Sequence, residues 1–109
     1  MSASRLDQLL QFHEEDPSDT FIRFALAAEY AKSGDFQKSR AHFEDLRSLD
    51  PDYVGLYYHL GKLLERMSLT GDALDTYRSG IIIASKISDF HARSELESAL
   101  LELEMGEFE

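Results

Sequence analysis

The chain has 109 residues, of which 43% are apolar, and a formal net charge of −10. It contains no cysteine, which excludes disulfides and thiolate chemistry, and its acidic balance argues against a general binder of nucleic-acid phosphates. No apolar run reaches the length of a membrane span, and the first residues do not read as a signal peptide. We therefore expect a single cytoplasmic domain over residues 1–109.

The first predicted element is a helix over residues 4–15. Ser4 is suited to cap its start, with Asp7 three residues on as a capping-box acid. Its apolar side is expected to consist of Leu6, Leu9, Leu10 and Phe12. The helix should end at Asp16-Pro17 and pack on the hairpin that follows it.

The dipeptide Asp16-Pro17 recurs one 34-residue step later as Asp50-Pro51. Proline cannot occupy a helix interior, so each pair predicts the end of one helix and the start of the next. Most positions between the two pairs have a counterpart one step downstream. The corresponding residues are Arg23 and Tyr57, Leu26 and Leu60, Ala27 and Gly61, Tyr30 and Leu64, Ser39 and Ala73, Phe43 and Tyr77, and Pro51 and Ser85. This period predicts two stacked helical hairpins, over 20–51 and 54–85.

The turns inside the two hairpins differ in sequence. Gly34-Asp35 is a good helix stop, because glycine takes the left-handed conformation without a Cβ penalty. Ser68 stands at the same place in the second unit, and Gly71 follows three residues later. The turn of the second unit therefore departs from that of the first.

A last helix is predicted over residues 88–105, capped by Ser88 or Asp89. Its apolar stripe comprises Leu96, Ala99, Leu100 and Leu103. The other side is acidic and serine-rich, which is typical of a helix that caps an array. The total is about six helices in an all-α fold.

The paired positions resemble the 34-residue pattern of the tetratricopeptide repeat (TPR) family, over roughly residues 17–85. The chain departs from that pattern at Arg23, Ser39, Ser68 and Ser85. The resemblance implies a right-handed superhelical array of antiparallel hairpins, in which the small residues Ala27 and Gly61 let paired helices lie close together. It also implies a protein-binding scaffold or adaptor.

In this family, the first helix of each hairpin lines a concave groove. The resemblance places eight partner-binding residues there: Phe21, Phe24, Ala28, Lys32, Tyr58, His59, Lys62 and Arg66. Basic and aromatic side chains on an acidic chain favour an acidic peptide with an apolar anchor. Other interpretations stay open: the side chains are simply solvated, the first helix covers Phe21 and Phe24, or Glu65 pairs with Lys62.

Some members of the family bind the terminal carboxylate of a chaperone tail through lysine and asparagine side chains. The positions that should carry these groups are Phe24, Ala28 and His59 in this chain. Binding of a chaperone tail by that clamp is therefore not expected.

No catalytic, cofactor or metal site is predicted. No two of the four histidines have the i, i+4 spacing of a helical metal site, and we expect His42 to be solvated. The sequence has neither a glycine-rich phosphate loop nor a GxSxG motif. We therefore expect a protein that is not an enzyme and binds no cofactor or nucleic acid.

The alternative function is self-assembly. Four isoleucines, Ile81, Ile82, Ile83 and Ile87, offer more apolar surface than one helix needs. They either pack the last helix or form the face of a homodimer.

Overall fold

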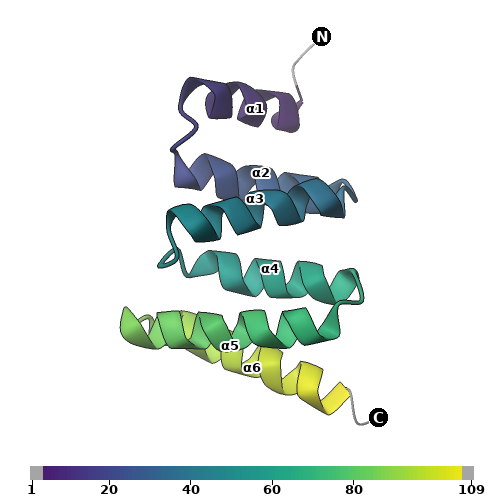
Figure 1. Ribbon diagram of the computed structural model, residues 1–109, viewed down its shortest axis with the longest axis vertical. Helices are drawn as coiled ribbons and strands as arrows, with labels where there is room; N and C mark the ends of the chain where they lie inside the picture. Colours follow the sequence, from purple (N-terminus) through teal and green to yellow (C-terminus); the bar gives the residue numbers. More distant parts are fainter. Residues whose placement is uncertain (1–3, 107–109) are drawn as a thin grey trace. The chain divides into compact units, whose positions relative to one another are not determined.

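The computed structural model describes residues 4–106, and the six elements within them are all α-helices (Figure 1). They are α1 (Arg5–Glu15), α2 (Thr20–Lys32), α3 (Phe36–Leu49), α4 (Gly55–Arg66), α5 (Thr70–Lys86) and α6 (Phe90–Gly106). The predicted all-α fold of helical hairpins is confirmed. None of the described helices is long and apolar enough to cross a membrane.

Contacts divide the chain into two compact units, Met1–Asp50 with α1–α3 and Pro51–Glu109 with α4–α6. The prediction of a single domain over 1–109 includes chain ends outside the described residues, and it stays a prediction.

One part of the core of the first unit forms where α1 packs on α2. Leu9, Ala25, Leu26 and Tyr30 are buried together, and Leu6 and Ile22 pack against them. The predicted apolar side of the first helix is only half right, because Leu10 and Phe12 are exposed.

The hairpin of α2 and α3 is joined by a buried hydrogen bond. Ser39, which replaces the alanine of the family pattern, is completely buried. Its hydroxyl donates to the carbonyl of Ala27 at 2.6 Å. The serine fits at this close contact because its buried polar group has a partner.

Each Asp-Pro pair is bonded to the helix that follows it. Arg23 Nη2 donates to the carbonyl of Pro17 at 3.0 Å. Tyr57, one period later, donates its hydroxyl to the carbonyl of Pro51 at 2.6 Å. Arg23 also pairs with Asp45 at 3.2 Å, so the arginine replaces the aromatic residue in this bond and adds a contact to α3.

In the second unit, two glycines allow close helix contacts. A Cβ at Gly61 would lie 2.6 Å from two ring carbons of Tyr77, so only glycine lets α4 lie this close to α5. A Cβ at Gly80 would lie 2.5 Å from Tyr57 Cβ and 3.0 Å from Leu96 Cδ1. Gly80 therefore lets α5 approach both α4 and α6.

Three helices end in the same left-handed turn. Gly34 has φ 87°, and serines take this conformation at Ser68 (φ 61°) and Ser88 (φ 59°). After each turn residue, the next backbone N–H donates to a carbonyl five residues back, as in the 2.9 Å bond from Leu69 to Leu64. This is the Schellman arrangement. Ser68 therefore forms the same turn as Gly34, although the second unit lacks the glycine at this position.

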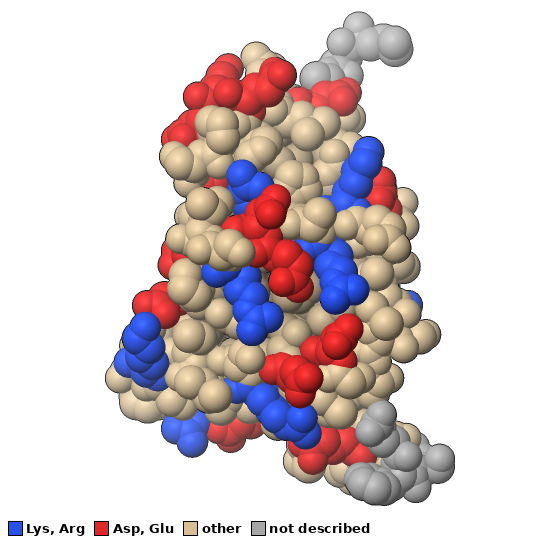
Figure 2. Space-filling view, in the orientation of Figure 1, with Lys and Arg blue, Asp and Glu red and all other residues tan. Residues whose placement is uncertain are grey.

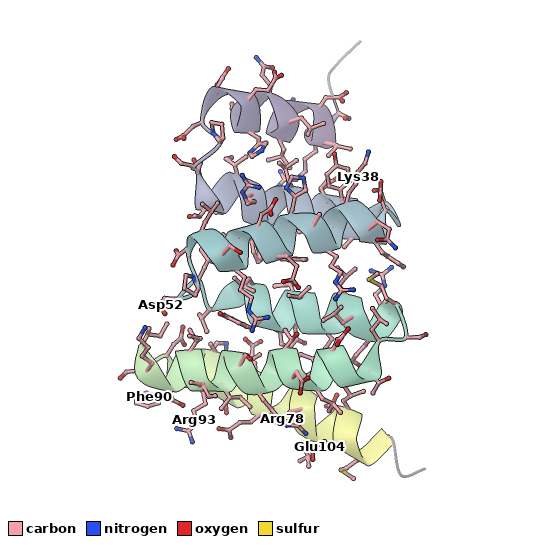
Figure 3. The ribbon with its side chains drawn as sticks, in the orientation of Figure 1. Lys38, Asp52, Arg78, Phe90, Arg93 and Glu104 are labelled. Atoms are coloured by element: carbon pink, nitrogen blue, oxygen red, sulfur yellow. The ribbon has the colours of Figure 1, made fainter. Side chains whose placement is uncertain are left out.

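The outer side of the last helix is more apolar than predicted. Asp89 caps α6 by accepting a 3.0 Å bond from the backbone N–H of Ala92, and Leu96 and Ala99 are buried as expected. However, Phe90 and Leu101 are exposed on the side predicted to be polar. Figure 3 shows Phe90, Arg93, Arg78 and Glu104 spread along α5 and α6, on the side away from α4.

We predict that substitutions at Gly61 destabilise the protein. Gly61→Ala is expected to lower the free energy of unfolding by about 1–3 kcal/mol, because the added methyl group overlaps the ring of Tyr77. Gly61→Leu should cost more. Urea or thermal unfolding followed by circular dichroism measures the change.

The matched control is Gly71→Ala, where an added Cβ meets nothing within 4 Å. It should leave the stability unchanged or raise it slightly, since alanine restricts the unfolded chain. Gly61 variants as stable as the wild type would contradict the close approach of α4 and α5.

Candidate partner-binding surface

In the first unit, the predicted site residues form one stripe along α2. Phe21, Phe24, Ala28 and Lys32 follow each other at intervals of three or four residues, which places them on one helix face. Phe21 is 64% exposed, so α1 does not cover it. Phe24 is half-buried and contacts Phe43 edge-to-face, with ring centroids 6.0 Å apart. Phe24 therefore belongs partly to the core.

Lys32, at the other end of this stripe, is exposed and forms no ion pair with any residue between 4 and 106. The rise of 1.5 Å per residue places it about 16 Å along the helix from Phe21. The α2 stripe thus offers an apolar end and a cationic end.

In the second unit, the predicted residues Tyr58, His59, Lys62 and Arg66 lie on α4. Tyr58 and His59 meet edge-to-face at 5.6 Å. Lys62 Nζ lies 5.6 Å from the centroid of the Tyr58 ring and 3.6 Å from a carboxylate oxygen of Glu65. The pairing with Glu65, left open from the sequence, is therefore present, while Arg66 is exposed one turn farther along the helix.

Glu65 is itself held by the core. The buried Tyr77 on α5 donates its hydroxyl to Glu65. Burial first, and then this hydrogen bond, raise the pKa of Tyr77 well above its ordinary value. The hydroxyl therefore stays protonated and keeps the carboxylate of Glu65 beside Lys62.

A cavity of about 380 Å³ opens between α4 and α6. Tyr58 and Lys62 line it from α4. The remaining lining comes from α6 and comprises His91, Ser94, Glu95, Ser98, Ala99 and Glu102. Sequence reasoning missed these α6 residues. Their spacing of three or four residues marks one helix face, but only the packing of α6 beside α4 shows that this face borders Tyr58.

The histidines do not form a metal site within residues 4–106, where no group of three or more metal-ligating side chains occurs. The expectation that His42 is solvated is wrong. Its ring stacks on Tyr30 with centroids 5.5 Å apart and meets His13 edge-to-face at 5.8 Å. Burial, together with the charge of Arg23, lowers the pKa of His42.

Charges elsewhere are mixed rather than segregated. Figure 2 shows acidic and basic side chains interspersed on the face in view. Many of them pair locally, as Arg93 does with Glu97 at 2.6 Å and Lys86 with Asp52 at 3.1 Å. Such exposed pairs add little to stability.

The lowered pKa of His42 predicts a pH dependence of stability. The unfolded chain binds more protons at this residue than the folded chain does, so acidification below the ordinary pKa of 6.5 favours unfolding. We expect the urea midpoint to fall between neutral pH and roughly pH 5.5, above the range where most carboxylates titrate. His42→Gln should reduce that slope.

The matched control is His91→Gln, because the side chain of His91, although it lines the cavity, is 88% exposed. This variant should keep the wild-type slope. A pKa for His42 at or above 6.5, measured by NMR titration, would contradict the burial of its ring.

The fold has solved counterparts with substantial sequence identity. A solution structure of a tetratricopeptide repeat domain protein from Salinibacter ruber is 49% identical, covers 82% of this chain and 90% of its own, and superposes with a TM-score of 0.78. A crystal structure of a domain protein of the same description from that organism is also 49% identical, with coverages of 79% and 97% and a TM-score of 0.74.

More distant structures share the fold alone. The TPR2B domain of yeast Sti1, solved in a complex with pHsp70, is 16% identical, with coverages of 93% and 81% and a TM-score of 0.86. No protein-family model matches the sequence, and no curated protein does. The identity and coverage shared with the Salinibacter ruber structures show that this chain belongs to the tetratricopeptide repeat domain proteins.

Proposed function

We propose that the chain is a protein-interaction module, a scaffold or adaptor without catalysis of its own. It binds partner segments through the α2 stripe in the first unit and, separately, through the exposed face of α4 in the second unit. The observation that carries this proposal is the exposure of Phe21. A phenylalanine that is 64% exposed at the end of a stripe of aromatic, small and basic residues is suited to bury an apolar partner side chain. The yeast TPR domain solved in a complex supports the same type of role.

The chemistry of the α2 stripe defines what this part of the partner should carry. Phe21 would contact an apolar anchor, and the small Ala28 leaves room for the partner backbone near the middle of the stripe. Lys32 would attract a carboxylate about three turns away. We infer an acidic partner segment with an apolar anchor at this surface.

Peptide display against the immobilised protein is the direct test. We expect enriched peptides to bind with measurable affinity in a fluorescence anisotropy assay. Phe21→Ala should weaken their binding about tenfold, within the range for an aromatic interface residue. Because Phe21 is exposed, the melting temperature should not change.

Leu49→Ala is the matched control, since Leu49 is also an exposed apolar residue of the first unit, on α3. It should leave peptide affinity unchanged. Amide shifts that fall on α3 and α5, and not on α2 and α4, would refute the assigned surface. A selection that enriches no binding peptide would overturn the proposed function.

Self-assembly is a second candidate because exposed apolar side chains recur between the last turns of α5 and the first residue of α6. Ile82 and Phe90 are 68% and 70% exposed, and Ile87 is exposed between them along the chain. If this region assembles two copies, sedimentation should show a dimer at high concentration that Ile82→Glu abolishes. Asp75→Lys, at an exposed position of the same helix, is the control for a change of surface charge. A monomer at all concentrations would remove this candidate.

The cytoplasmic location expected from the sequence stays a prediction. A fluorescent fusion examined in the source cell would test it.

A further inference from the structure

The cavity between α4 and α6 lies wholly within the second unit and is distinct from the α2 stripe. Its volume of about 380 Å³ is at the lower end of the range for ligand pockets. A space of this size suits one side chain of a partner. The charges of the lining residues determine which side chain it would favour.

The one lysine of the cavity is already compensated. Lys62 lies 3.6 Å from Glu65, which is not among the lining residues, and over the Tyr58 ring. Glu65 cannot readily leave, because Tyr77 holds it from the core. Lys62 therefore adds little net positive charge to the cavity.

The two carboxylates of the cavity are not compensated in this way. Among the described residues, the ion pair that Glu95 forms is with the exposed His91, at 3.7 Å, and it exists only when the imidazole is protonated. Glu95 also interacts electrostatically with His59 on α4, a residue that does not line the cavity. Glu102 forms no ion pair with any residue that the structure describes. Both glutamates lie on one face of α6, two turns or about 10 Å apart, with Ser98 between them.

We propose that this cavity binds the guanidinium group of an arginine side chain from a partner protein. This inference rests on the proposed function and names the partner chemistry at the second unit. A guanidinium has five N–H donors in a planar fork, which can reach a carboxylate and the hydroxyl of Ser98 or Ser94 together. Tyr58 and Lys62 form the α4 wall. Lys62 Nζ lies 5.6 Å from the centroid of the Tyr58 ring, and an arginine would stack on the part of the ring that faces the cavity. A lysine ammonium lacks this planar surface.

The probes are three blocked tripeptides with glycine on both sides of a central arginine, citrulline or glutamate. In NMR titrations, the arginine peptide should shift the amides of Tyr58, Ser94, Ser98 and Glu102. Citrulline has the same shape but no charge, so its shifts should be several-fold weaker. The glutamate peptide should shift none of these amides.

Variants locate the charge that binds the arginine. Glu102→Gln and Glu95→Gln should each weaken binding of the arginine peptide about two- to fivefold, as expected for partly exposed charge pairs. The matched control is Glu104→Gln, which makes the same change on the same helix. Figure 3 shows Glu104 on the side away from α4, so this variant should bind like the wild type.

Equal shifts from the arginine and citrulline peptides would overturn the inference. So would a loss of affinity for the arginine peptide in Glu104→Gln as large as that in Glu95→Gln and Glu102→Gln. Binding of the glutamate peptide at these residues would overturn the arginine assignment but leave the interaction role standing. The proposed interaction role is tested separately by the peptide display against the whole chain, and it fails if that selection enriches no binding peptide. Unchanged circular dichroism melts show that the variants are folded.

Discussion

The close contact between α4 and α5 at Gly61 controls both the packing and the charge of the second unit. Because position 61 has no side chain, the ring of Tyr77 lies directly on α4. That position brings the Tyr77 hydroxyl to Glu65, and Glu65 in turn lies beside Lys62. The absence of a side chain at position 61 thus also affects the charge at the surface, because it places Glu65 where it pairs with Lys62.

The same logic extends to α6 through the second close contact. Gly80 lets Tyr57 and Leu96 approach the α5 backbone, and the burial of Leu96 fixes the rotation of α6 about its own axis. Glu95 and Glu102 lie on the neighbouring face and therefore border the cavity. Packing residues thus set the direction in which the charged side chains of α6 point.

The 34-residue period was sufficient to predict the two hairpins, and capping residues with apolar stripes predicted the first and last helices, because helix ends and turns depend on local sequence. A departure from the family pattern was a poor guide at a position where only the ability to donate a hydrogen bond mattered. Arg23 departs from the family pattern, but like Tyr57 it donates to a proline carbonyl. The partial burial of His42 and the α6 wall could not be predicted, since both depend on which side chains of different helices meet in the packed structure.

Net charge adds a longer-range consideration to these contacts. A chain with a net charge of −10 repels acidic partners and attracts basic ones at distances up to the screening length of about 10 Å in ordinary salt. A carboxylate near Lys32 would gain only from the short-range contact, whereas an arginine approaching Glu95 and Glu102 gains from the whole field. The association rate of an arginine-bearing partner at the cavity should therefore depend strongly on salt. At the α2 stripe, the apolar contact at Phe21 would instead govern how long the complex lasts.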